Sequence, residues 1–160
     1  MNMENYKELF FKRRKSPRLP NYDYENHNYY FVTICTHEKR CLFGNAADLN
    51  RYGKVAEEAI ENIRKQNILV EQYVIMPNHI HMIIVIGCGI SEKKRLDTVI
   101  GLYKSGVSRE IHKFDPNITV WQRSFHDHVI RNRKSYEKIW EYVTYNPQKW
   151  KEDCFYCDVQ

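Results

Sequence analysis

Two histidines separated by one residue stand in a strongly apolar stretch, VIMPNHIHMIIVI (residues 74–86). Alternate side chains of a β-strand point to one face, so His79 and His81 would share a face, about 6.6–7 Å apart along the strand. Two imidazoles at this spacing can converge on one divalent ion. A third ligand would have to come from elsewhere in the fold, while Ile80 and Met82 would be buried on the opposite face.

The same pair could instead be two histidines satisfied by hydrogen bonds on a half-exposed sheet. Polar rings in such an apolar strand are costly unless they have partners, which favours a functional site. Several related motifs are excluded. A zinc deaminase needs H-x-E, but position 81 is His, and no Pro precedes Cys154. A histidine triad would need His rather than Ile83, and H-E-x-x-H is absent.

Two further pairs are weaker candidates. His126-Asp127-His128 has a charged central residue, which suits an exposed strand edge and a supporting or DNA-facing role. Cys154-x-x-Cys157 is half of a zinc motif, and we interpret it as two plain thiols.

The composition indicates one domain whose core needs no disulfide or bound metal to hold it together. The chain has 160 residues, of which 42% are apolar, enough for a core of its own. Its five cysteines are odd in number and irregular in spacing, which favours a reducing cytosol over a disulfide framework. No run of about 18 apolar residues occurs, so we expect no membrane span and a cytoplasmic protein.

The charge is modest but unevenly placed. Lys and Arg exceed Asp and Glu by 25 to 20, and basic residues cluster at positions 12–18 and 131–134. Twelve tyrosines offer flat surfaces on which bases could stack. Basic clusters with aromatics indicate a nucleic-acid partner, although an ordinary solvated surface explains the charge alone equally well.

The hydrophobic pattern predicts an α+β fold. Strands are expected at 29–36, 68–75 and 79–86, helices at 54–66, 93–114 and 135–146, and a short strand or hairpin at 117–130. The order β-α-β-β-α-β is that of the ferredoxin-like (RRM-like) fold, an antiparallel sheet with helices on one face. The last helix is additional. We expect a basic N-terminal arm (1–25), the main domain (26–150) and a short tail (151–160).

The final predicted helix carries a phenol and an amide one turn apart. Tyr142 and Asn146 lie on one face, and Pro147 should end the helix. A phenol and a metal-binding carbonyl oxygen could therefore meet at one site. Tyr145 is the rival phenol, but it lies about 100° around the helix from Asn146.

Together these motifs resemble those of the single-tyrosine HUH transposases, in which H-hydrophobic-H on a strand precedes a helix carrying Tyr and an amide. MPNHIH (76–81) and YVTYNP (142–147) are most similar to the REP-associated tyrosine transposases. YFVTICT (30–36) and WQRSFHDHVIRN (121–132) support the resemblance, which covers roughly residues 25–150.

The resemblance implies a role for each residue. His79 and His81 match the two metal-binding histidines, Tyr142 the nucleophile and Asn146 the third ligand. That ligand is Gln in much of the wider family, so Asn146 is a departure. The cofactor would be Mg²⁺ or Mn²⁺, and the reaction would be cleavage of single-stranded or hairpin DNA through a 5′-phosphotyrosine.

Phosphate contacts would come from basic residues and one histidine, although each could equally be a solvated surface residue. The candidates are Arg13, Arg14, Lys104, Arg109, Arg123, His128 and Arg131. The protein could act as a homodimer and would be nucleoid-associated when bound to DNA. Two alternatives stay open. One is a domesticated, inactive module that only binds nucleic acid, and the other is a metal-dependent phosphoesterase that uses water.

Overall fold

The computed structural model describes residues 28–87 and 94–157. The predicted N-terminal arm, with Arg13 and Arg14, lies outside the described residues, as does Cys88.

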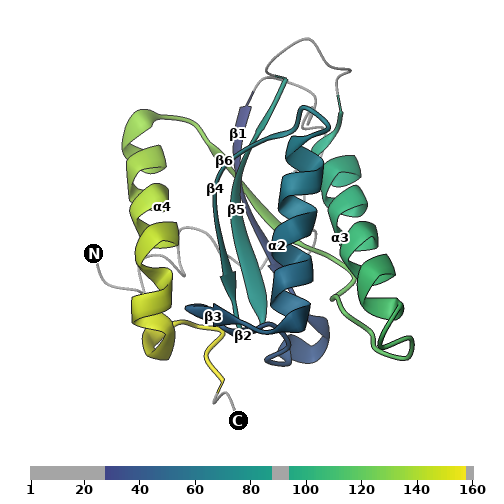
Figure 1. Cartoon of the computed structure of the whole chain (residues 1–160). Coiled ribbons are helices and arrows are strands. Elements are labelled where there is room, and N and C mark those ends of the chain that lie inside the picture. The colour runs from purple at the N-terminus through teal and green to yellow at the C-terminus, as the bar shows by residue number, and fades with distance from the viewer. Residues whose placement is uncertain (1–27, 88–93, 158–160) are drawn as a thin grey trace.

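A four-stranded antiparallel sheet forms the middle layer of the molecule (Figure 1). Its strands are β1 (Asn28–Cys35), β4 (Leu69–Met76), β5 (His79–Ile86) and β6 (His126–Ile130), in the spatial order β4-β5-β1-β6. This order, with helices in the two crossovers, is the ferredoxin-like topology, so the predicted fold is confirmed. A small hairpin, β2 (Gly44–Asn45) with β3 (Asp48–Leu49), leads into the first long helix.

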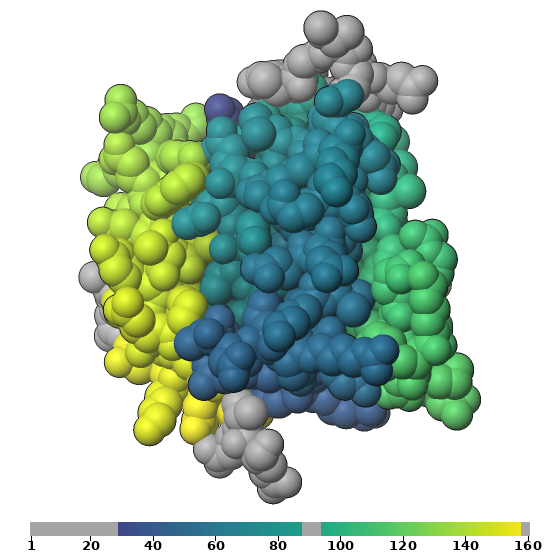
Figure 2. Space-filling model, in the orientation of Figure 1, coloured from purple at the N-terminus to yellow at the C-terminus, as the bar shows by residue number. Residues whose placement is uncertain are grey.

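Two helices cover one face of the sheet, α2 (Arg51–Arg64) and α3 (Leu96–His112). The main core lies between them and the sheet, because alternate residues of β5 such as Ile80 and Met82 point that way. Figure 2 shows α2 in front, with α3 and the C-terminal part of the chain on either side. Asn50 begins α2 by accepting hydrogen bonds from the backbone N–H groups of Tyr52 and Gly53.

The opposite face of the sheet carries α4 (Arg133–Tyr145) (Figure 1). The Asn132 side chain caps its first turn by accepting from the Ser135 N–H, and Pro147 follows its end as predicted. A second core forms here, made of Phe31, Ile83, Ile130, Ile139 and Val143. The 3₁₀ helix η2 (Asn146–Glu152) then brings the chain back under the sheet.

The predicted elements are confirmed with small shifts of their ends. The helix expected at 54–66 begins at Arg51, because Asn50 provides the cap. The one expected at 93–114 spans Leu96–His112, and position 93 lies outside the described residues. The hairpin considered for 117–130 is not formed. Only β6 is a strand there, and Trp121 makes a single bridge to Thr36.

The interpretation of Cys154 and Cys157 as two plain thiols was wrong for Cys157. Cys41 and Cys157 form a disulfide between the loop after β1 and the C-terminal segment. They stand 116 residues apart, so no local spacing pointed to this pair. Among the described residues, Cys35 and Cys154 are not part of a disulfide.

Candidate active site

A two-residue turn, Pro77-Asn78, joins β4 to β5 and places His79 at the first position of β5. The Asn78 side-chain amide donates to the backbone carbonyls of Phe155 (2.7 Å) and Lys39 (3.1 Å). Its carbonyl oxygen therefore faces His79 Nδ1 at 2.9 Å and accepts from it. Since Nδ1 of His79 carries the proton, Nε2 is left with its lone pair.

His81 lies on the same face of β5, as the alternation predicts. Its Nδ1 is 2.8 Å from the Thr33 hydroxyl on β1, its ring stacks on Phe31 at 5.0 Å, and its Nε2 is 3.0 Å from Nε2 of His79. Without a cation, His81 Nε2 donates to His79, and Thr33 donates to His81 Nδ1. Because the hydroxyl can rotate to accept instead, His81 can switch tautomer and free its Nε2 lone pair.

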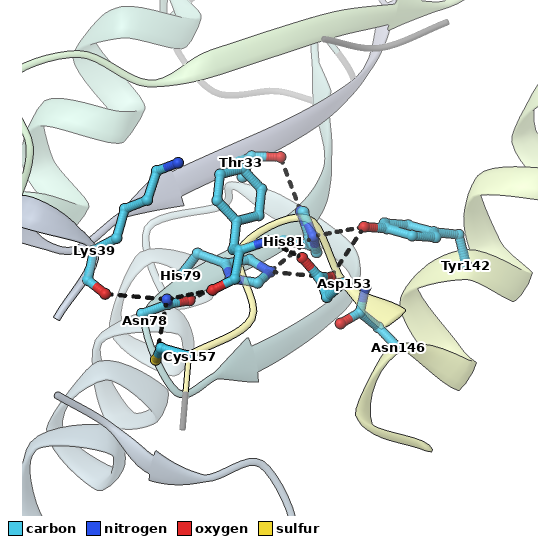
Figure 3. Close-up of polar contacts among 10 residues, drawn as sticks. Thr33, Lys39, Asn78, His79, His81, Tyr142, Asn146, Asp153 and Cys157 are labelled. Carbon is cyan, nitrogen blue, oxygen red and sulfur yellow. Dashed lines mark hydrogen bonds and ion pairs between the residues drawn. The ribbon is translucent and has the colours of Figure 1, made fainter. Parts of the chain in front are cut away.

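A carboxylate from the C-terminal segment completes the cluster (Figure 3). Asp153 Oδ2 lies 3.9 Å from His79 Nε2, and its other oxygen accepts from the Phe155 N–H at 2.7 Å. One ligand atom each from His79, His81 and Asp153 lie within 4.8 Å of one another. All three residues are buried.

Tyr142 and Asn146 approach the cluster from α4 and the first residue of η2, as Figure 3 shows. The Tyr142 hydroxyl is 3.3 Å from His81 Nε2 and 3.4 Å from Asp153 Oδ2. The Asn146 amide donates to Asp153 Oδ2 at 3.1 Å, while its carbonyl oxygen is buried and has no hydrogen-bond partner among the described residues. The helical spacing of this phenol and this amide thus brings both to the histidines.

Burial dominates the electrostatics of the site. It lowers the pKa of His79 to about 3, helped by the charge of Lys39. The pKa of His81 is also well below its usual value because of burial and the neighbouring His79. Burial and the Asp153 carboxylate raise the pKa of Tyr142, so both imidazoles and the phenol are neutral near pH 7.

These groups fit a divalent cation. Two neutral imidazole nitrogens and a carboxylate oxygen are ordinary ligands for such an ion. The orphaned carbonyl oxygen of Asn146 is a buried acceptor beside them, and a cation would satisfy it. Asn78 and Thr33 bond the outer nitrogens of the two imidazoles, the usual way in which metal-binding histidines are oriented.

The C-terminal segment, from Pro147 to Cys157, packs against His79. The His79 ring lies 4.7 Å from the Phe155 ring and 6.1 Å from the Trp150 ring, measured between centroids. The disulfide at Cys157 holds the end of this segment. In this arrangement neither histidine has solvent-exposed surface.

Comparison with known proteins identifies the family. Residues 23–146 match the model of the IS200-like transposases. The chain belongs to this family. The family predicted from the histidine and tyrosine motifs is thereby confirmed.

The chain is also similar to individual proteins. A Haemophilus influenzae protein described only as uncharacterized is 34% identical over 169 aligned positions, covering 91% of this chain and 94% of the relative. A REP-associated tyrosine transposase bound to a REP hairpin superposes with a TM-score of 0.63 at 19% identity, covering 82% and 73% of the two chains. A candidate transposase from Deinococcus radiodurans R1 gives 0.53 at 12% identity, covering 79% and 95%. At these identities the two structures establish the fold.

The residues predicted to contact DNA do not lie together. Lys104 on α3 donates to the backbone carbonyls of Gln122 and Arg123 and is half-buried. Arg109 is exposed on α3, across the sheet from the histidines, and Arg123 is exposed before β6.

His128 and Arg131 lie on the site's side of the sheet. His128 pairs with Phe31 and shares its face, and exposed Arg131 follows β6 at the start of the α4 cap.

Among the residues that the structure describes, no helix is long and apolar enough to cross a membrane.

Asp153 was not among the site residues predicted from the sequence. It stands in the segment KEDCFYC (151–157), beyond the predicted domain, where one acidic residue among charged neighbours gives no pattern. Asn78 and Thr33, which orient the imidazoles, were also missed. Asn78 directly precedes His79 in the quoted MPNHIH motif, so that motif held a signal for it.

Proposed function

We propose that this transposase is a metal-dependent endonuclease and strand transferase that acts on single-stranded DNA at or near hairpins. Tyr142 is its nucleophile. The observation that carries the proposal is the position of the Tyr142 hydroxyl, within 3.4 Å of both an imidazole nitrogen and a carboxylate oxygen. A tyrosine that only packed against the sheet would not need its hydroxyl among ionisable groups.

The reaction is a transfer of one phosphodiester bond. The Tyr142 oxygen attacks the scissile phosphorus, the bond from phosphorus to the 3′-oxygen breaks, and a 5′-phosphotyrosine forms. The phenolic proton passes to the Asp153 carboxylate, whose Oδ2 is 3.4 Å from the hydroxyl and has a second lone pair beside the one that would face the cation. The leaving 3′-oxygen takes up a proton. Attack by another 3′-hydroxyl reverses the step, because the phosphotyrosine conserves the bond.

His79, His81 and Asp153 would hold the cation, Mg²⁺ or Mn²⁺, with the Asn146 carbonyl oxygen as a further ligand. When bound, the cation would withdraw charge from the scissile phosphate and favour attack by oxygen. Burial makes the histidines good ligands, since their low pKa keeps both neutral near pH 7.

Hairpin DNA as substrate is supported by the family and by the REP hairpin bound to the structural relative. Basic residues at the start of α4, Arg131, Arg133 and Lys134, lie at one end of the helix that carries Tyr142. They would contact the strand through its phosphates.

The test is cleavage of an end-labelled single-stranded hairpin with and without Mn²⁺, followed on a denaturing gel. We expect cleavage that needs the cation, together with a labelled band that migrates as protein bound to DNA. Cleavage without that band would favour a phosphoesterase that uses water. Binding of a cognate hairpin without cleavage would favour an inactive binding module, and either result would overturn the proposal.

A further inference from the structure

A cavity of about 440 Å³ lies at the N-terminal end of α4, between this helix and the sheet. It is separate from the histidine cluster, which lies near the other end of α4. The walls come from four elements: the start of β1, an irregular part of β4, the end of β6 and the first turn of α4. Its lining includes Tyr29, Glu71, Arg131, Arg133 and Tyr136.

Two tyrosine rings form one side of this cavity. The Tyr29 and Tyr136 rings are 5.6 Å apart between centroids and nearly perpendicular, at 82°. Both residues are half-buried and line the cavity. Aromatic faces of this kind stack with nucleobases whatever the base sequence.

A β-bulge aims Glu71 at the cavity. Val70 pairs with Ile84 and Gln72 with Ile83, so Glu71 is the extra residue on the edge strand β4. The bulge lets two consecutive polar side chains reach α4, since Glu71 accepts from the Tyr136 hydroxyl at 2.6 Å and Gln72 donates to Thr144 at 3.1 Å. Bulges commonly redirect a side chain next to a binding site.

The Glu71 carboxylate can still accept hydrogen bonds from a ligand. Its oxygen Oε2 accepts from Tyr136, and no other described residue donates to the carboxylate. A carboxylate offers acceptors only, so it favours a base that presents an amino group. Cytosine, adenine and guanine carry one, whereas the single donor of thymine, N3–H, stands between two carbonyl oxygens that a carboxylate repels.

The rim of the cavity is cationic. Arg131 makes no ion pair or hydrogen bond with another described residue, and it is exposed. Arg133 is exposed on the first turn of α4, where its Nε pairs with the Glu137 carboxylate at 2.8 Å. The amino-terminal end of a helix adds its own positive field. Such a rim suits the phosphates on either side of a base held inside.

We propose that this cavity binds one unpaired base of the DNA strand, and that Glu71 selects a base carrying an amino group. The inference rests on the proposed function, because it names a feature of the same substrate. Tyr136 and Tyr142 are six residues apart on α4, about 9 Å along the axis at 1.5 Å per residue. The bound base therefore lies close to the bond that is cleaved.

The test compares fluorescent oligodeoxycytidylate and oligodeoxythymidylate of equal length by fluorescence anisotropy at pH 8. Whichever nucleotide enters the cavity, the cytidylate places an amino group there and the thymidylate does not. We expect the cytidylate to bind about tenfold more tightly, the usual size of one base-edge contact. Glu71→Gln should bring the ratio close to one, because an amide can also donate to thymine.

Glu57→Gln is the matched control. Glu57 on α2 accepts from the Tyr73 hydroxyl at 3.2 Å, so it is a second Tyr–Glu pair, on the other face of the sheet. The control should keep the tenfold ratio. A wild-type ratio near one, or an unchanged ratio in Glu71→Gln, would overturn the inference and leave the proposed function standing if the covalent product still forms. Failure to bind either oligonucleotide, with no covalent product, would overturn both.

Discussion

The hydroxyl of Tyr142 lies 3.3 Å from Nε2 of His81, although 61 residues separate them in the chain. The distance is set by the second core, in which Ile139 and Val143 of α4 pack on Ile83 of β5. The phenol is thus positioned by rigid packing between a helix and a strand. This relationship connects the fold to the proposed chemistry.

The identity of the third metal ligand is open to direct measurement. Asp153→Asn removes the carboxylate, and we expect it to weaken Mn²⁺ binding at least tenfold, because oxygen ligands bind hard cations mainly through charge. Asn146→Ala should weaken binding less. Titration calorimetry on both variants, with the exposed Glu152→Gln as control, measures this. If only Asn146→Ala loses affinity, the ligand set expected from the sequence is correct and Asp153 is not a ligand.

Stability should depend on pH through the two buried histidines. The folded-state pKa of His79 is about 3 and that of His81 is also lowered, whereas an unfolded histidine titrates near 6.5. The unfolded state therefore binds more protons, and the stability is fully present above about pH 6.5 and is lost as pH falls toward 3. The expected loss is about 1.4 kcal/mol per pH unit for each histidine.

Urea unfolding of the metal-free protein between pH 7.5 and 4.5 measures this dependence. His79→Gln should flatten the profile, because one of the two groups no longer takes up a proton on unfolding. A wild-type profile that is flat over this range would mean that the histidines are solvated in the folded state.

The disulfide should stabilise the oxidised protein. Cys157→Ser opens a loop of more than a hundred residues, and chain entropy predicts a loss of about 4–5 kcal/mol in the free energy of unfolding. Cys154→Ser is the control, since Cys154 is not part of a disulfide. Alkylation followed by mass spectrometry checks the link itself. Burial raises the pKa of Cys35 to about 12, so this thiol should react slowly in the folded chain.

A wild-type protein whose melting temperature does not change with reductant would contradict this prediction. So would full alkylation of Cys41 without reductant.

Much of the site could be predicted from local periodicity. A period of two placed His79 and His81 on one face of a strand, and a spacing of four placed Tyr142 and Asn146 on one face of a helix. These features depend only on the backbone geometry of a single strand or helix, and the spacing of residues in the sequence is enough to predict that geometry. The fold followed from the order of such elements.

The rest depends on tertiary contacts that have no local period. Asp153 reaches the histidines because the chain turns back after Pro147 and the Asn78 amide holds the Phe155 carbonyl. The Cys41–Cys157 link and the bulge at Glu71 also depend on which segments meet in space. A single acidic residue near the C-terminus does not indicate that the chain turns back toward the histidines.

The proposed function requires that Tyr142 becomes covalently joined to DNA. The most direct measurement is peptide mapping by mass spectrometry after incubation with a cognate single-stranded hairpin and Mn²⁺. We expect a nucleotide-modified peptide with the modification on Tyr142, its loss in Tyr142→Phe and its retention in Tyr145→Phe, whose tyrosine is 49% exposed. An adduct that survives in Tyr142→Phe, or a modification on Tyr145, would contradict the account.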